Sequence, residues 1–555
     1  MKDAHPTPKP TADRVGIDGI RFGQSYASLP DAFHSRTAPT PVPEPRLIHL
    51  NRPLAESLGL DPELLESREG VEMLAGNRVP AGAEPVAMAY AGHQFGNWVP
   101  QLGDGRAILL GEVVDLEGIR RDVQLKGAGR TPFSRRGDGR SSIGPAIREY
   151  LGSEAMAALG IPTTRALAVL STGEEVLRER PEPGGILVRV ATSHVRVGTF
   201  EYFARRGDAA SVVRLADFVI ERHYPHLVDH DDRYRELLAG VLRRTADLVA
   251  NWLLVGFIHG VMNTDNTSVV GETIDYGPFG FLDPYRPDEV YSSIDWQGRY
   301  AFNQQPGIAH WNLARLAETL LTLLADEPEE GVERAQEVLT EFPDRFETTF
   351  HRGLVAKIGL APPPGAAGSS GSEEEGESPL IPPRRTRLVT PGPKPAAADV
   401  QLALDLLGRM ARENADMTRT FRALSELDGT PQGGGVDAVA SQESSGAKGD
   451  EAVRGLFDDP TAFDEWARRW RARLASEPRD DEERIRAMKR VNPSFILRNH
   501  LAQEAVDAAV EELDFEPMQR LLPLLARPFD DHPENADTIR PPAKAERVTR
   551  TFCGT

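Results

Sequence analysis

Apolar residues recur in regular patterns over residues 47–358, and the pattern alternates between two kinds. Strand-like runs at residues 107–114 and 186–190 are mainly apolar, as is typical of buried strands. Apolar residues spaced three and four apart over residues 143–159, and again over 238–253, predict amphipathic helices. The mixture indicates an α+β or α/β body, and α+β is the fold class that we predict.

The last third of the chain has a different pattern. Helical periodicity at residues 400–424, 460–474 and 493–513 is interrupted by segments rich in Gly, Pro, Ser and acidic residues. Because such segments have too few apolar side chains to pack, we expect them to be disordered. The predicted organisation is an N-terminal extension (1–85), a core (86–358), a disordered linker (361–398) and a mainly helical C-terminal region (399–555) with a disordered loop at 429–450.

Composition narrows the class of protein. The chain has 555 residues and a formal net charge of −20, which argues against nucleic acid or an anionic membrane as a partner. It has no run of about 18 apolar residues, and its N-terminus lacks the apolar segment of a signal peptide. We therefore expect a cytoplasmic protein, and we expect a monomer. The single cysteine, Cys553, excludes an intramolecular disulfide and a cysteine metal cluster.

The stretch HGVMNTDN, from His259 to Asn266, has the spacing of a phosphotransferase catalytic loop. In kinases such a loop reads His, any residue, Asp, four further residues and Asn, where the Asp accepts the proton of the attacking hydroxyl. Here Val261 occupies the position of that Asp. Either the site is inactive or its base lies elsewhere, and the nearest candidate is Asp265. Asp265 could instead be a carboxylate that caps the loop.

Two short β-like runs, at residues 267–270 and 272–274, follow this loop and lead to an Asp-Tyr-Gly sequence that begins at Asp275. Kinase-like folds bring two metal ligands together with four successive elements: a helix, a loop ending in Asn, a hairpin and an Asp-aromatic-Gly sequence. Asn266 and Asp275 would supply oxygen ligands to Mg²⁺ or Mn²⁺, which would hold the phosphates of a nucleotide.

Glycines and charged residues upstream fit the same kind of site. Gly103 and Gly105 precede a predicted strand, where they would let the backbone approach phosphates, and Arg106 would supply charge. Lys126 ends a short apolar strand and Glu149 lies on the helix that follows, as in the lysine–glutamate pair of kinases. The alternatives stay open: Gly-Asp-Gly is also an ordinary turn, and the pair would also fit two solvated surface charges.

A second Gly-Asp-Gly sequence, in TPFSRRGDGRSS, carries Asp138 and Gly139. Further along, Arg189 lies on a predicted strand and Arg196 follows shortly after it. Arginines in an apolar setting are costly to desolvate unless an anion or a carboxylate meets them. A phosphate clamp and structural ion pairs both account for these two arginines.

Five motifs in this order resemble the selenoprotein O family, which includes the bacterial YdiU-like proteins: GHQFGNWVPQLGDGR, QLKGAGRTPFSRRGDGRSS, ATSHVRVGTFEYF, HGVMNTDN and TIDYGPFGFLDPY. The similarity runs from about Phe22 to Phe302, and NPSFILRNHLAQEAV extends it into the C-terminal region. The resemblance implies a protein-kinase-like (pseudokinase) fold whose catalytic core binds ATP in a flipped orientation. It also implies a protein adenylyltransferase, which transfers AMP to Ser, Thr or Tyr hydroxyls of proteins and releases pyrophosphate. By the same resemblance, Val261 occupies the position of a kinase base that the family no longer uses.

By this resemblance, Asp265 matches the family's proton acceptor, and Asn266 and Asp275 match its ligands for Mg²⁺ or Mn²⁺. Glu149 matches the helical glutamate that pairs with the lysine. The positions that contact ATP are matched by Gly103, Gly105, Arg106, Lys126, Asp138, Gly139, Arg189, Arg196 and Asp275. Family members often carry selenocysteine or cysteine at a position like that of Cys553, but this chain has no second cysteine to bridge to it.

Two other functions remain open from the sequence. An atypical kinase would transfer the γ-phosphate of ATP, although Val261 argues against it. A nucleotide-binding scaffold would bind ATP without turnover and regulate a partner.

Overall fold

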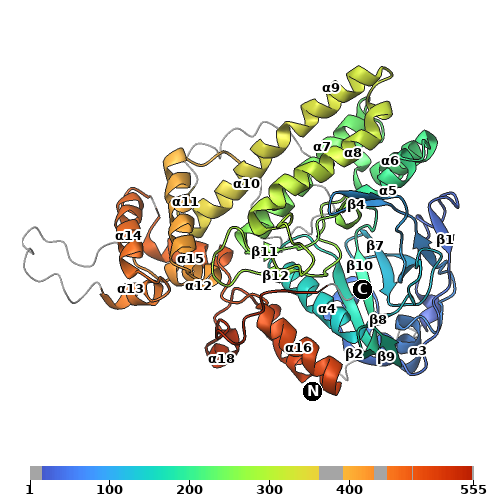
Figure 1. Ribbon diagram of the computed structural model, residues 1–555, viewed down its shortest axis with the longest axis horizontal. Coiled ribbons are helices and arrows are strands. Elements are labelled where there is room, and N and C mark those ends of the chain that lie inside the picture. Colours follow the sequence, from blue (N-terminus) through green and yellow to red (C-terminus); the bar gives the residue numbers. More distant parts are fainter. Residues whose placement is uncertain (1–15, 362–391, 430–446, 478, 553–555) are drawn as a thin grey trace, which may run out of the picture.

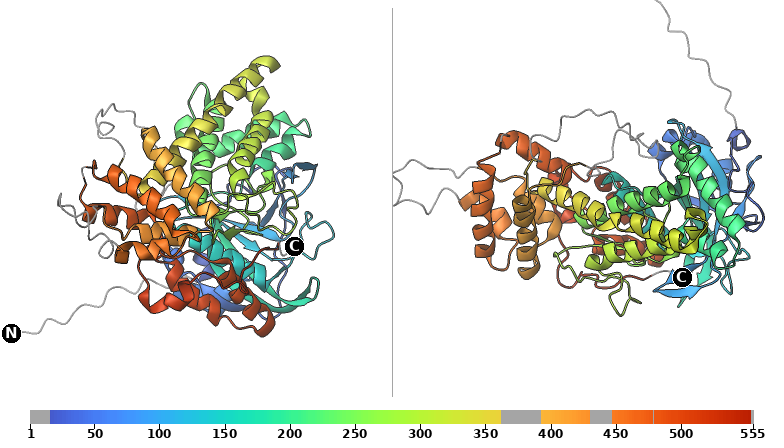
Figure 2. Two further views of the ribbon diagram at one scale, coloured as in Figure 1. Left: turned by 60° about the vertical axis from the view of Figure 1, so that its left-hand side comes forward. Right: turned by 90° about the horizontal axis from the view of Figure 1, so that it is seen from above.

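The computed structural model describes residues 16–361, 392–429, 447–477 and 479–552. Figure 1 shows a strand-rich part at one end of the longest axis, long helices across the middle and further helices at the other end, and the views in Figure 2 agree. The chain is thus mixed α and β with a mainly helical C-terminal region, as the hydrophobic pattern predicted. Cys553 lies outside the described residues.

The main sheet has eight strands in the order β1, β3, β6, β7, β10, β9 and β2, with β8 paired to β10. All of its pairings are antiparallel. Both predicted strands are confirmed, one as β6 and one within β10. The strands span His34–Arg36 (β1), Arg46–Leu50 (β2), Val86–Met88 (β3), Ala107–Val114 (β6), Arg120–Lys126 (β7), Ser141–Ser142 (β8), Arg165–Leu177 (β9) and Pro181–Ala191 (β10).

Both faces of this sheet are covered, which explains why β6 and the middle of β10 are mainly apolar and do not alternate between apolar and polar residues. Successive side chains of a strand point to opposite faces. Ile108 and Leu110 accordingly pack in one cluster with the N-terminal helices, whereas Leu109 packs in the large cluster that contains α4. The N-terminal helices are Arg52–Ser57 (α1), Pro62–Glu66 (α2) and Arg68–Leu74 (α3). The segment predicted as an N-terminal extension therefore supplies these helices and both edge strands, β1 and β2.

The helices of the middle part match the periodic segments of the sequence. The predicted helix over 143–159 is α4, and the one over 238–253 lies within α7. In Figure 1 the long helices α7, α8 and α10 run beside one another. The helices span Ile143–Ala158 (α4), Val197–Ala204 (α5), Ala209–His223 (α6), Arg233–Leu254 (α7), Gln305–Leu324 (α8), Pro328–Leu339 (α9) and Glu341–Lys357 (α10).

The C-terminal region is helical, with boundaries that differ in part from the prediction. Its helices are Ala397–Arg412 (α11), Met417–Leu424 (α12), Ala447–Arg454 (α13), Pro460–Leu474 (α14), Asp481–Val491 (α15), Asn499–Glu512 (α16), Glu516–Leu525 (α17) and Ala536–Ile539 (α18). The single pattern at 400–424 is two helices, because Asn414 has a left-handed φ of 52° and the Asp416 side chain caps α12. The pattern at 493–513 becomes helical only at Asn499; Ile496 and Leu497 are buried ahead of the helix.

Most of the two segments predicted to be disordered lies outside the described residues. Each segment has one described end that is helical, so the prediction of disorder is wrong there. Residues 397–398 belong to α11 and residues 447–450 belong to α13.

The predicted hairpin over residues 267–274 is also wrong. Its two runs do not pair with each other; Ser268 bridges to Arg196, and Thr273 bridges to Thr163. The sequence pattern was read as local pairing, whereas the backbone partners come from distant parts of the chain. The catalytic loop (residues 259–266) is instead preceded by Phe257–Ile258 (β11), which pairs with Gly280–Phe281 (β12) after the Asp-Tyr-Gly sequence.

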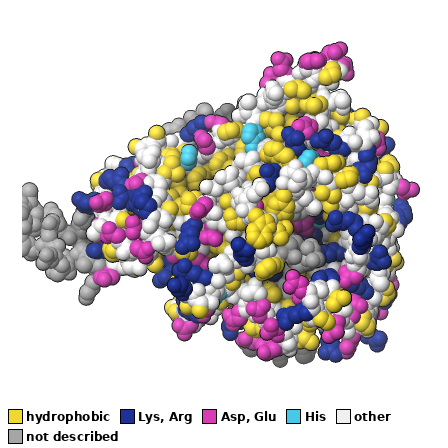
Figure 3. Space-filling model, in the orientation of Figure 1, with side chains coloured by type: hydrophobic (Ala, Val, Ile, Leu, Met, Phe, Trp, Pro, Cys, Tyr) yellow, Lys and Arg dark blue, Asp and Glu magenta, His cyan; other side chains and the backbone are white. Residues whose placement is uncertain are grey.

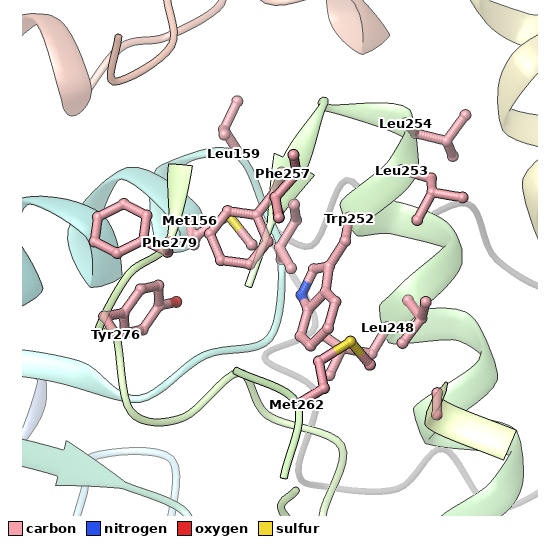
Figure 4. Packing of buried hydrophobic residues seen from close by; sticks show 14 of the residues in the cluster. Met156, Leu159, Leu248, Trp252, Leu253, Leu254, Phe257, Met262, Tyr276 and Phe279 are labelled. Atoms are coloured by element: carbon pink, nitrogen blue, oxygen red, sulfur yellow. The ribbon is translucent and has the colours of Figure 1, made fainter. Parts of the chain in front are cut away.

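An apolar cluster anchors both ends of this region. Figure 4 shows Phe257 between the indole of Trp252, from α7, and the rings of Tyr276 and Phe279. The rings of Phe257 and Phe279 stack with centroids 5.9 Å apart, and Trp252 Nε1 donates to Thr273 Oγ1 at 2.9 Å. The catalytic loop and the segment that carries Asp275 are therefore fixed to α7 by the same buried side chains.

The surface carries charges of both signs. On the face drawn in Figure 3, Lys and Arg side chains are interspersed with Asp and Glu. Within the described residues, no helix is both long and apolar enough to cross a membrane.

A buried lysine lies where α10 meets the C-terminal helices. Lys357 ends α10 and is only 4% exposed. Its ammonium group donates to Asn492 Oδ1 at 3.0 Å and to the Val491 carbonyl at 3.3 Å, and it lies over the Phe421 ring. Neither oxygen is charged, and burial lowers the pKa of Lys357 to about 7.

This lysine should make stability depend on pH. Its pKa of about 7 in the fold lies below the ordinary value of 10.5, so between these values the unfolded chain binds more protons. The free energy of unfolding then rises with pH, by up to about 1.4 kcal/mol per pH unit. We expect the melting temperature of Lys357→Met to gain less than that of the wild type when the pH is raised from about 7 to 9, measured by thermal unfolding.

The matched control is Lys544→Met, because Lys544 is exposed. This variant should keep the pH response of the wild type. The same response in wild type and Lys357→Met would contradict the prediction.

Candidate active site

Asp275 lies at the centre of a buried charge cluster. Arg189 Nη2 donates to its Oδ1 at 2.5 Å, and Arg196 Nη1 donates to its Oδ2 at 2.7 Å. Both arginines are buried; Arg189 belongs to β10, and Arg196 immediately precedes α5. Burial alone would raise the pKa of Asp275, but Arg196, Arg189 and Lys126 hold it well below its usual range. The carboxylate is therefore ionised, and it compensates the two buried cations.

Lys126 and Glu149 belong to the same cluster. Lys126 Nζ donates to Glu149 Oε2 at 2.5 Å, and Arg189 Nε donates to Glu149 Oε1 at 2.6 Å. Lys126 is the last residue of β7, and Glu149 lies on α4. Both residues are buried, so the alternative of solvated surface charges is wrong. Because Arg189 contacts both Glu149 and Asp275, it joins the helix to the Asp-Tyr-Gly segment.

The backbone at Asp275 is in an unfavourable conformation. Its φ is 63°, in the left-handed region that costs a residue other than glycine about 1–3 kcal/mol. Contacts on both sides hold it there: the two arginines bind its side chain, and the next residue, Tyr276, hydrogen-bonds through its hydroxyl to Thr163. Strain of this kind persists where the surroundings fix it, and it concentrates at functional sites.

Asp265 is the second buried carboxylate of the region. It lies in a short 3₁₀ helix, Thr264–Asn266 (η3), and is 6% exposed. Gln94 Nε2 donates to its Oδ2 at 3.2 Å, whereas Oδ1 is buried and has no hydrogen-bond partner among the described residues. Burial raises the pKa of Asp265 to about 7, against the opposing effect of the Gln94 hydrogen bond. A carboxylate of this kind can accept a proton near neutral pH.

One arginine connects Asp265 to the charge cluster. Arg196 Nη1, which binds Asp275, also donates to the backbone carbonyl of Asp265 at 2.8 Å. Asp265 and Asp275, the two carboxylate residues predicted for the site, therefore both contact the side chain of Arg196.

The rest of the catalytic loop is held through its backbone. Val261 is buried, and its carbonyl accepts a hydrogen bond from Asn266 Nδ2 at 3.1 Å. His259 Nε2 lies 2.8 Å from the carbonyl oxygen of Ile274, next to Asp275. The valine side chain offers no group that accepts a proton, so the base of this loop cannot be at the kinase position.

The two glycine loops pack on each other. Gly103 has a φ of 86°, and a Cβ there would come within 2.4 Å of the Phe133 ring. A Cβ at Gly105 would come within 3.0 Å of the Phe133 carbonyl oxygen, and Thr131 Oγ1 donates to the Asp104 carbonyl at 2.7 Å. The close approach of the loops thus explains the first Gly-Asp-Gly sequence, whatever ligand it binds.

The second Gly-Asp-Gly sequence has contacts of its own, outside the charge cluster. Gly139 has a φ of 73°, and a Cβ there would come within 2.2 Å of the Gly129 backbone. Asp138 is exposed and forms an ion pair with Arg178 at 2.8 Å. Arg106 lies close enough to the cluster for its charge to help lower the pKa of Lys126, after burial and Arg189.

A hairpin that the sequence interpretation did not single out also contacts the catalytic loop. It consists of Gly92–Gln94 (β4) and Asn97–Val99 (β5). Besides the Gln94 contact with Asp265, Phe95 N donates to Asn263 Oδ1 at 3.0 Å, and Tyr300 Oη donates to the same oxygen at 2.7 Å. The only signal for this hairpin was the GHQFG sequence within one of the motifs that carry the resemblance.

The two residues predicted to bind a metal ion keep oxygen atoms that can accept further partners. Each oxygen of Asp275 accepts one arginine and keeps a further lone pair, and Asn266 keeps its side-chain oxygen as an acceptor. Within the described residues, no group of three or more His, Cys, Asp or Glu side chains could hold a metal ion. A magnesium ion on a nucleotide needs only one or two protein ligands, because phosphates and water complete its coordination. The oxygens of Asn266 and Asp275 are of the type that such a site uses.

Comparisons with known proteins agree with these motifs. The protein nucleotidyltransferase YdiU of Alkalilimnicola ehrlichii is 56% identical over 536 residues, which cover 96% of this chain and 98% of that protein. The protein of the same name from Rhodopseudomonas palustris strain HaA2 is 54% identical over 534 residues, covering 96% and 99%. The family model described as protein adenylyltransferase SelO matches residues 18–526. The predicted resemblance is confirmed over nearly the whole chain, which belongs to the SelO family of protein adenylyltransferases.

Proposed function

We propose that this chain transfers AMP from ATP to Ser, Thr or Tyr hydroxyls of proteins, with Asp265 as the proton acceptor and Mg²⁺ or Mn²⁺ as the cofactor. Membership of a family of protein adenylyltransferases supports the class of reaction. The observation that carries the assignment of the base is the buried carboxylate of Asp265, whose Oδ1 has no partner among the described residues. Val261 leaves the kinase position without a base.

A kinase-like fold for residues 86–358 is part of this proposal. In kinases a strand lysine pairs with a helical glutamate, and a catalytic-loop Asn and an Asp-aromatic-Gly sequence follow. The contact between Lys126 of β7 and Glu149 of α4, and the hydrogen bonds that tie the cluster to Asp275, support the same arrangement here.

The proposed reaction is a displacement at the α-phosphorus of ATP. The acceptor oxygen forms a bond to that phosphorus while the bond to the oxygen that bridges the α- and β-phosphates breaks. The electron pair of that bond leaves with pyrophosphate, and the hydroxyl proton passes to Asp265 Oδ1. A carboxylate with a pKa of about 7 is a stronger base than an ordinary aspartate.

The nucleotide would lie against the charge cluster and the glycine loops. Its phosphates would meet Arg189 and Arg196, and Asn266 and Asp275 would hold the metal ion. When bound, Mg²⁺ or Mn²⁺ would neutralise charge that builds up on the phosphates in the transition state. The remaining positions proposed to contact ATP are Gly103, Gly105, Arg106, Lys126, Asp138 and Gly139.

The Asp265→Asn variant tests the base. An amide of the same shape cannot take the proton, so we expect AMP transfer to fall by roughly 10²–10⁴-fold. ATP binding, measured by calorimetry, should change by less than about twofold because the charge cluster is left intact. Asp229→Asn, at an exposed position, is the matched control and should keep full activity. AMP transfer that survives Asp265→Asn would remove Asp265 from this role.

A label on ATP separates adenylylation from kinase chemistry. With Mg²⁺ or Mn²⁺ present, we expect a protein extract to gain label from the α-phosphate and none from the γ-phosphate. Intact-mass analysis of the labelled proteins should show the addition of AMP. Transfer of the γ-phosphate would instead establish an atypical kinase, and ATP binding without any transfer would favour the scaffold.

A further inference from the structure

The β4–β5 hairpin is joined to the catalytic loop by three hydrogen bonds from consecutive residues. His93 N donates to Thr264 Oγ1 at 2.7 Å, Gln94 Nε2 donates to Asp265 Oδ2 at 3.2 Å, and Phe95 N donates to Asn263 Oδ1 at 3.0 Å. The outer two bonds come from the backbone of the hairpin, and only the middle one comes from a side chain. The position of the hairpin is therefore set without the Gln94 side chain.

Other contacts fix the hairpin independently. The ring of His93 lies 2.6 Å from Glu201 Oε1, on α5, and packs against Trp98 and Trp311. At the tip, the ring of Phe95 packs against that of Tyr300, with centroids 5.0 Å apart. These anchors make the hairpin a rigid support for whatever its Gln94 side chain holds.

The two side-chain oxygens of Asp265 have different surroundings. Oδ2 accepts the hydrogen bond from Gln94, while Oδ1 is buried without a hydrogen-bond partner among the described residues. Gly92 leaves room for that second oxygen, because a Cβ at this position would come within 2.6 Å of it. The hairpin thus contacts both oxygens: Gln94 holds Oδ2 by a hydrogen bond, and Gly92 lets Oδ1 lie against its backbone.

We propose that Gln94 is a positioning residue for AMP transfer: by binding Oδ2 of Asp265, it fixes the orientation of the carboxylate that takes the proton of the acceptor hydroxyl. This inference rests on the proposed function and deepens it. A carboxylate without this contact could turn about its side-chain bonds, so that the base would be in place for only part of the time. Misplacement of a reacting group by about 1 Å can cost on the order of 100-fold in rate.

The test is Gln94→Ala, assayed with ATP and an acceptor protein. We expect kcat for AMP transfer to fall by roughly 10- to 100-fold, while KM for ATP and the melting temperature stay within the error of the wild type. A residue that only supports the fold would lower the melting temperature, and a residue that binds nucleotide would raise KM for ATP. Either of these results, or an unchanged kcat, would overturn the proposal.

A second variant acts on the same carboxylate without removing a polar group. Gly92→Ala places a methyl group against Asp265 Oδ1, so it should also lower kcat with little change in KM for ATP. The matched control is Asn97→Ala, at the exposed residue that pairs with Gln94 across the same hairpin, which should keep the kcat of the wild type. A loss of activity in Asn97→Ala equal to that of Gln94→Ala would assign the effect to the hairpin as a whole.

Failure of this inference and failure of the proposed function give different results. If the wild-type protein transfers no AMP, the proposed function fails. If it transfers AMP and loses this activity in Asp265→Asn but not in Gln94→Ala, the function stands and the role of Gln94 is excluded.

Discussion

The site depends on the pairing of buried charges around Asp275. The cluster alternates in sign through Lys126, Glu149, Arg189, Asp275 and Arg196, each in contact with the next. An unpaired charge at any of these buried positions would cost several kcal/mol, so the members constrain one another. Three cations against two anions leave one positive charge, which favours an anionic ligand such as a phosphate. The same contacts join β7, α4, β10 and the Asp-Tyr-Gly segment, so the elements that form the sheet and its covering helix also place the groups that would bind nucleotide.

The catalytic loop lies between this cluster and the β4–β5 hairpin, and it is held from both sides. Arg196 contacts Asp275 on one side and the backbone of Asp265 on the other. The hairpin binds three consecutive loop residues, 263–265, through hydrogen bonds of its own. Beneath the loop, the apolar packing of Trp252 and Phe257 fixes its ends. A loop supported in this way can keep a buried carboxylate in one orientation, which a solvent-exposed loop could not.

Much of this arrangement could be predicted from the sequence, because it follows from local periodicity. The short strand that ends at Lys126 and the helix over 143–159 were both predicted from local patterns, and these two elements carry the contact between Lys126 and Glu149. Contacts between residues far apart in the chain leave no periodic pattern in the sequence. The predicted hairpin over 267–274 failed because its backbone partners lie in distant segments, and Gln94 was missed because it contacts a residue 171 positions away. The break between α11 and α12 depends on one left-handed residue, Asn414, which hydrophobic spacing does not reveal.

A valine at the position that the base has in kinases is compatible with the hydrogen bonds of the loop for a structural reason. At Val261 the loop uses the backbone carbonyl, which accepts the Asn266 side chain, and any residue supplies that carbonyl. The side chain at this position is therefore free to change from a carboxylate to a buried apolar group without moving Asn266. At Asp265 the opposite holds, because its side chain is the group that the hairpin binds and that Gly92 accommodates. The geometry of the loop thus tolerates substitution at the kinase position, while it demands a small polar side chain four residues later, on the side that faces the hairpin.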